Sequence, residues 1–164
     1  MIYLVLVFAS FNLFAAKQEH KAHAHGAGKM SIAFEAAKGQ LTLEAPGESI
    51  YGFEHVAKTA AHKKKQAEAL TKLETGVAEM VVFEKQLNCN FTKQKLEISQ
   101  DGNHAEVQAA FVIQCEKDPV GSTIRFHVQS VFPKLKNVDV QVLAGDVQKA
   151  VKATKNGVQV ELKK

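Results

Sequence analysis

The sequence lacks the motifs that identify most enzymes. It contains no Gly-x-Ser-x-Gly nucleophile elbow and no His-Glu-x-x-His metalloprotease motif. The glycine-rich stretch 26–31 does not form a phosphate loop, because Met30 stands where that motif needs a serine or threonine to hold magnesium. We therefore expect a protein without enzymatic activity.

Cysteine is scarce. Cys89 and Cys115 are the only two cysteines, and their spacing is far from a Cys-x-x-Cys pattern. In an oxidising compartment such a pair usually forms a disulfide, which here would stabilise the fold by roughly 3–4 kcal/mol. Two alternatives stay open at this point, a cysteine zinc ligand and a cysteine nucleophile paired with a histidine.

A concentrated charge of one sign is also missing. The formal net charge is +4, and the basic residues are scattered apart from the run 63–65. No aromatic residue interleaves with that run, so we expect no nucleic-acid partner and interpret the lysines as a solvent-facing part of a helix.

Long apolar runs are absent beyond the first sixteen residues. Residues 1–16 contain no Asp, Glu, Lys or Arg, but a membrane-spanning helix needs ~20 apolar residues. The stretch resembles a signal peptide that ends in small residues at Ala15 and Ala16. No basic residue precedes it and the large Phe14 lies near its exit, so a buried N-terminal strand or an anchor remains the alternative. Removal of a signal peptide predicts an exported protein without a stable membrane span.

Histidine is the chemically informative residue type that is present. The chain has seven histidines, and three of them crowd the polar segment 17–28, which we expect to be mobile. His23 and His25 are two residues apart, so in an extended chain both imidazoles point the same way and can bind one Zn²⁺. His20 is a further candidate in this segment, although short histidine-rich stretches also occur as plain surface features.

Two other parts of the chain place histidine beside a carboxylate. His104 and Glu106 repeat the two-residue spacing on the polar face of a predicted strand, and Glu54 directly precedes His55. Each pair offers a zinc ligand with a carboxylate that binds the metal or orients the imidazole. An ordinary solvent-facing pair is the alternative for both. His62 lies in the first turn of the predicted helix and His127 lies on a predicted strand, and we interpret both as structural residues without a role in metal binding.

Hydrophobic periodicity predicts an α+β fold: a single domain over 29–164 with a mostly antiparallel sheet and one long helix. The helix is expected to begin after Thr59 as N-cap and to end at Gly76. Turns are expected at Lys38-Gly39, at Asp101-Gly102 and at Asn156-Gly157. The middle turn would bring the two cysteines to one end of a hairpin.

The order of several motifs resembles the ZrgA family of Gram-negative periplasmic zinc-binding proteins. The matching segments are His23-Ala24-His25-Gly26, Ile32-Ala33, Gly52-Phe53-Glu54-His55 leading into Lys58-Thr59-Ala60, Cys89, His104-Ala105-Glu106, Cys115 and Phe132-Pro133-Lys134-Leu135. The resemblance covers nearly the whole chain after residue 16, and its most specific part is the Gly-Phe-Glu-His block.

The resemblance implies a periplasmic protein that binds zinc and assists zinc acquisition or storage, with a zinc uptake system as a possible partner. It also implies an α+β fold without known enzymatic activity. The metal-site candidates carried over are His23, His25, Glu54, His55, His104 and Glu106. This chain departs from the family pattern in two respects: a long His- and Asp-rich insertion before His104 is replaced by the short turn 99–103, and Ala57 stands where the family often has a proline before the helix. The alternative function is a non-metal envelope protein that acts through protein contacts on its sheet.

Overall fold

The first described element is a hairpin whose side chains alternate between core and solvent. The computed structural model of the chain describes residues 26–164. In β1 (Ala27–Glu35) and β2 (Lys38–Pro46) every second residue is buried, which is the pattern of a sheet covered on one face. The chain turns at Ala36, which has a positive φ of 50°.

The turn predicted at Lys38-Gly39 is therefore misplaced, because both residues belong to β2. Gly39 is the register partner of Phe34 in β1. A Cβ at Gly39 would lie 2.6 Å from the Phe34 ring, so the glycine serves to admit an aromatic ring across the strand pair.

The hairpin lies at the centre of a six-stranded sheet with the order β4-β5-β2-β1-β7-β8. All neighbouring strands are antiparallel except β1 and β7, which are parallel. The four outer strands are β4 (Asn90–Asp101), β5 (His104–Gln114), β7 (Asn137–Ala144) and β8 (Val147–Ala153).

A second, three-stranded sheet has the order β3-β6-β9. Its strands are β3 (Val81–Phe83), β6 (Thr123–Phe126) and β9 (Val158–Glu161). The hairpin predicted at Asn156-Gly157 is wrong, because β9 pairs with β6 and β8 belongs to the large sheet. The turn therefore carries the chain from one sheet to the other.

Helix α2 (Ala60–Met80) is capped as the sequence predicts, since the Thr59 side chain accepts a hydrogen bond from the backbone N–H of His62. It does not end at Gly76. That glycine is buried inside the helix, where a Cβ would lie 3.0 Å from Val131 of α3 (Val128–Val131). Gly76 therefore allows α2 and α3 to pack closely. The other short helices are α1 (Gly47–Ile50) and the 3₁₀ turn η1 (Lys85–Leu87).

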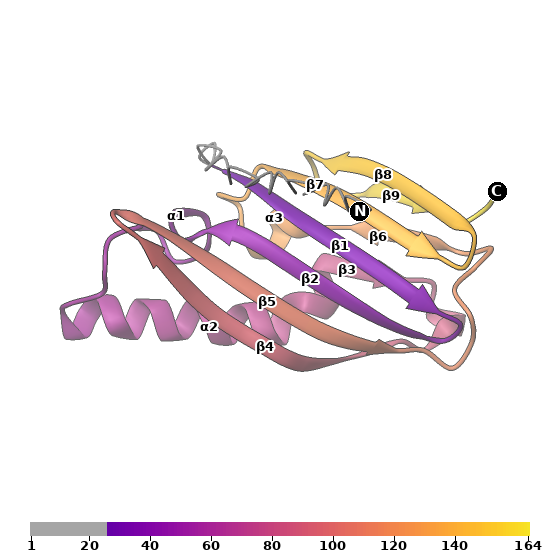
Figure 1. Cartoon of the computed structure of the whole chain (residues 1–164), viewed down its shortest axis with the longest axis horizontal. Helices are drawn as coiled ribbons and strands as arrows, with labels where there is room; N and C mark the ends of the chain where they lie inside the picture. Colours follow the sequence, from indigo (N-terminus) through magenta and orange to yellow (C-terminus); the bar gives the residue numbers. More distant parts are fainter. Residues whose placement is uncertain (1–25) are drawn as a thin grey trace, which may run out of the picture.

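The core lies between the large sheet and a layer formed by α2 and the small sheet (Figure 1). Only the C-terminal part of α2 enters it, through Leu73, Val77 and Met80, whereas the apolar side chains of Ala60 and Ala67 nearer the start of the helix are exposed. The other face of the large sheet is open to solvent.

The α+β class with a single sheet and one long helix is corrected by this architecture. Strands hold 48% of the described residues, in two sheets, so the fold is β-rich. The sequence pattern indicates short strands near 124–128 and 158–162, but it does not show that β3, β6 and β9 form a sheet of their own, because that pairing joins segments distant in sequence. No helix within residues 26–164 is long and apolar enough to cross a membrane.

The predicted disulfide is present. Cys89 and Cys115 are bonded to each other, just outside the ends of β4 and β5. The alternatives of a cysteine zinc ligand and a free thiol nucleophile are not met in this structure, because neither sulfur is free.

Candidate functional site

The described metal-ligand candidates gather at one end of the large sheet. The turn between β4 and β5 lies there, beside α1 and the chain that leads from α1 into α2 (Figure 1). The amide of Gln100 connects the two segments by donating a hydrogen bond to the Glu54 carbonyl oxygen at 2.9 Å. Residues separated by 46 positions in the sequence are thereby fixed beside one another.

His104 and Glu54 form the central contact of this region. Nδ1 of His104 lies 2.7 Å from Oε2 of Glu54. An ionised carboxylate only accepts hydrogen bonds, so Nδ1 carries the proton and donates it. The Glu54 side chain is 16% exposed, while that of His104 is 74% exposed. The carboxylate therefore holds one nitrogen of a ring whose remaining surface faces solvent.

Gln100 fixes the turn that carries His104. Besides Glu54, its Nε2 lies 3.0 Å from the Gly102 carbonyl oxygen and 3.1 Å from the His104 carbonyl oxygen. The two hydrogens of this one amide are thus shared among three backbone carbonyl oxygens, two of them in the turn itself and one in the segment that carries Glu54. The sequence offers no signal for this role, because a glutamine before a turn is indistinguishable from any other surface polar residue.

His55 has a different environment from its neighbour Glu54. Its ring stacks on Phe53, with centroids 4.8 Å apart and an interplanar angle of 18°. His62 of α2 contacts both rings, at 4.8 Å from Phe53 and 4.8 Å from His55. His62, interpreted from the sequence as purely structural, therefore belongs to the same cluster as a candidate ligand.

The buried Tyr51 extends this cluster, because its ring contacts Phe53 edge to face, with centroids 4.7 Å apart. Burial raises the pKa of the Tyr51 hydroxyl above its usual 10.0; the Gln66 side chain acts in the opposite direction, and the negative charge of Glu54 raises it further. The hydroxyl therefore stays protonated at neutral pH. It is a neutral group close to the Glu54 carboxylate.

Glu106 shares the solvent-facing side of β5 with His104, as the alternation of the strand predicts. Its register partners are Ser99 of β4 and Pro46 of β2. Side chains two residues apart on a strand are separated by about 7 Å at their backbones. Glu106 is thus a neighbour of the His104 ring on the same surface.

The two histidines of the His-x-His segment, His23 and His25, lie outside the described residues. The described chain begins beside them at Gly26, whose carbonyl oxygen accepts a hydrogen bond from the Asn137 amide at 2.9 Å. Ala27 of β1 pairs with Asn137 at the same end of the sheet as the β4–β5 turn. One strand, β2, separates β1 from β5.

Residues 26–164 do not assemble three His, Cys, Asp or Glu side chains into one potential metal-binding group. Glu54 and His104 meet, His55 and His62 meet, and Glu106 stands nearby. Within the described chain these are incomplete ligand sets, since zinc generally takes three or four protein donors.

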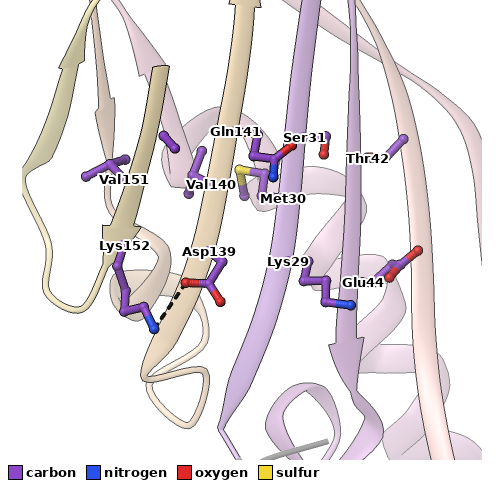
Figure 2. A pocket seen from close by; sticks show the side chains of 11 residues that line it. Lys29, Met30, Ser31, Thr42, Glu44, Asp139, Val140, Gln141, Val151 and Lys152 are labelled. Atoms are coloured by element: carbon purple, nitrogen blue, oxygen red, sulfur yellow. Dashed lines mark ion pairs between the residues drawn. The ribbon is translucent and has the colours of Figure 1, made fainter. Parts of the chain in front are cut away.

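A hollow of about 760 Å³ on the open face of the large sheet is a second candidate (Figure 2). Its charged groups come in opposite pairs: Lys152 bonds Asp139 at 3.2 Å, and Lys29 is the register partner of Glu44. Among residues 26–164 its lining includes no histidine or cysteine, and the charges of these lining residues balance. This surface therefore favours neither a zinc ion nor a strongly charged ligand.

Comparison with protein families supplies an independent finding. Residues 22–162 match the model of the ZrgA family, described as zinc uptake proteins. No curated protein sequence matches the chain significantly. The family match spans the whole His-x-His-Gly segment, the Glu54–His104 pair and both cysteines, and it covers far more than half of the sequence. The chain belongs to the ZrgA family of zinc uptake proteins.

Proposed function

We propose that the protein binds zinc in the periplasm and holds it for an uptake system, without catalysing a reaction. The observation that carries the proposal is the His104–Glu54 contact. With Nδ1 donating to Glu54, Nε2 of His104 is left as the unprotonated nitrogen that a metal needs. A carboxylate behind a histidine is the usual outer-shell arrangement of zinc sites, and it strengthens the imidazole as a ligand.

His104 would need partners, and the candidates stand within reach. Glu106 lies on the same face of β5. Neighbouring strands are about 4.8 Å apart, so β1 and β5 are separated by roughly 10 Å. His23 precedes Ala27 by four residues, a stretch that spans up to about 13 Å when extended. The proposed site is therefore composite: His104 with Glu54 behind it, completed by His23, His25 or Glu106.

His55 fits this site less well. Its ring is stacked on Phe53, and its Nδ1 lies 3.1 Å from the Val56 carbonyl oxygen. We keep it as a candidate ligand of secondary rank, which would have to leave the aromatic stack to reach a metal shared with His104.

Calorimetric titration with zinc tests the proposal directly. The full protein is recovered from the periplasmic fraction of a Gram-negative host and freed of metal with a chelator. We expect about one tightly bound zinc per chain at neutral pH, weakening in acid because imidazole binds zinc only when it is neutral. Absence of zinc binding at neutral pH would refute the proposal. His127→Ala is a matched control, because His127 lies between β6 and α3.

The alternative function, a non-metal envelope protein acting through protein contacts, rests on the uncovered face of the large sheet. That face exposes Leu143 of β7 by 46% and carries the hollow lined by Lys29 and Asp139. A partner that co-purifies equally well with and without chelator, from a protein that fails to bind zinc, would favour this alternative.

A further inference from the structure

A second concave surface lies on the helical side of the molecule, between α1, α2 and α3. It is a depression of about 340 Å³. Its floor is apolar and is made by Ile50, Tyr51, Val131 and Phe132, which are at most 7% exposed. Its rim carries the lysines Lys65, Lys72 and Lys134. Neither zinc binding nor core packing requires an apolar floor with cationic groups at its rim, so this surface calls for a separate interpretation.

Two of these ammonium groups approach the same point. Gly52, with φ at +94°, leaves space beside its backbone where a Cβ would lie 3.0 Å from Lys65 Nζ and 3.9 Å from Lys134 Nζ. None of the ion pairs that the structure places within residues 26–164 uses either lysine. Like charges that converge in this way repel each other, and an anion between them removes that repulsion.

Lys72 is held in a different way. Its Nζ donates a hydrogen bond to the Val131 carbonyl oxygen at 2.6 Å and lies 5.5 Å from the centre of the Phe132 ring. It is thus a fixed part of the wall and adds positive charge to the depression. The single acidic residue of the lining, Glu68, is 65% exposed and lies 3.8 Å from Lys64, a distance at the limit of an ion pair.

The depression continues along the surface. A neighbouring hollow of about 240 Å³ shares Ser49 and Lys134 with it and adds Gly26, Lys136 and the acidic Glu48, so that lysines outnumber carboxylates among the described residues of both hollows. Two adjoining hollows with lysines along both suit an extended chain better than a compact anion. A concave surface also suits a chain segment better than a flat bilayer.

We propose that this lysine-rimmed groove, defined by Ile50, Lys65, Lys72, Val131, Phe132 and Lys134, binds an acidic peptide segment of a partner protein. The segment would place a carboxylate between Lys65 and Lys134 and an adjacent apolar side chain on the floor. Charge complementarity selects this occupant: the chain's own residues 17–25 contain Lys17, Lys21 and a single Glu19, so that segment is not acidic. Binding requires no metal.

Fluorescence anisotropy with a labelled, capped octapeptide in which glutamate alternates with leucine tests the proposal on the full protein, with chelator present throughout. A matched peptide has glutamine in place of glutamate. We expect the acidic peptide to bind about 10-fold more tightly than the glutamine peptide and to weaken with added salt, as charge-guided contacts do. Equal binding of the two peptides would overturn the proposal.

Variants locate the site. Lys65→Gln with Lys134→Gln should weaken the acidic peptide by about 10-fold, whereas Lys117→Gln with Lys155→Gln, two exposed lysines elsewhere with the same change in net charge, should not. Glu68→Gln should tighten binding slightly, because it removes an acidic side chain from the lining of the depression. Equal loss in both double variants would show a mere effect of net charge and would contradict the proposal.

Two competitors distinguish other anions. Millimolar inorganic phosphate should displace the peptide only weakly, since it cannot use the apolar floor. Vesicles containing phosphatidylglycerol should not compete. If either bound the groove more tightly than the acidic peptide, the assignment to a peptide segment would be wrong. Because zinc is absent, these outcomes do not depend on the proposed zinc function.

Discussion

The two ends of the β4–β5 hairpin are held by different kinds of interaction. At one end the Cys89–Cys115 disulfide joins the strands covalently beside buried Leu87. At the other end the turn is held by hydrogen bonds from Gln100 and by the contact between His104 and Glu54. The disulfide end is fixed by a covalent bond and by buried apolar side chains. The turn end is held by polar side chains, which can release a hydrogen-bond partner and bind a metal ion instead. The comparison predicts that stability and metal binding can be changed separately.

The largest effect should come from the disulfide. Replacing both cysteines by serine, Cys89→Ser with Cys115→Ser, should lower the free energy of unfolding by roughly 3–4 kcal/mol, because the reduced chain regains loop entropy in the unfolded state. Chemical denaturation measures this loss. Zinc affinity of the folded variant should stay within about threefold of the parent, since a disulfide at the far end does not position the ligands.

The converse change is made at the other end. His104→Ala should reduce zinc affinity by about 10- to 100-fold. It should change the free energy of unfolding by less than about 1 kcal/mol, because the hydrogen bond to Glu54 that it removes is largely exposed on the histidine side. Titration and denaturation of the same sample measure both. A large loss of stability with unchanged zinc affinity would contradict the account, because it would assign His104 to the stability of the fold and not to metal binding.

A variant of Glu54 distinguishes whether this carboxylate binds the metal itself or only positions His104. Glu54→Gln keeps the size of the side chain but gives a weaker acceptor for the Nδ1–H of His104. We expect zinc affinity to fall by about 10-fold, less than in His104→Ala, because His104 itself still binds. A loss as large as that of His104→Ala would indicate that Glu54 contacts the metal directly.

The smallest effect concerns Tyr51. Because its pKa is raised in the folded state, the folded protein holds this proton more tightly than the unfolded chain does. The corresponding stability is present below about pH 10 and is lost as the pH rises further. Tyr51→Phe should flatten this part of the stability profile between pH 9 and pH 11, measured by denaturation. An unchanged slope in the variant would assign the alkaline loss to other groups.

The parts of this hairpin that the sequence predicts are those with local signals. Alternation of apolar residues predicts the buried face of β5, and Asp101-Gly102 predicts its turn. The pairing of Cys89 with Cys115 follows from equal distances to that turn. In contrast, Asn156-Gly157 carries an equally strong turn signal, yet the strand after it joins another sheet. Turn chemistry specifies that the chain reverses, while sheet membership depends on contacts distant in sequence.

The same distinction applies to the site. Residue types and spacing single out Glu54 and His104 as candidates, but nothing local indicates that they meet across fifty residues of sequence. The family resemblance includes both residues among its matching segments, but it does not show that their side chains contact each other. Gln100 and His62 carry no signal at all, because their roles arise from the hydrogen bonds and ring contacts that the fold creates.

The central claim is that His104 presents Nε2 to zinc while Glu54 holds Nδ1. Long-range ¹H–¹⁵N NMR of the histidine-labelled protein during zinc titration tests it most directly. We predict that zinc shifts the Nε2 resonance of His104 and that Nδ1 stays protonated, with His127 unaffected. Zinc binding that leaves the His104 nitrogens unchanged, or that removes the proton from Nδ1, would contradict the account.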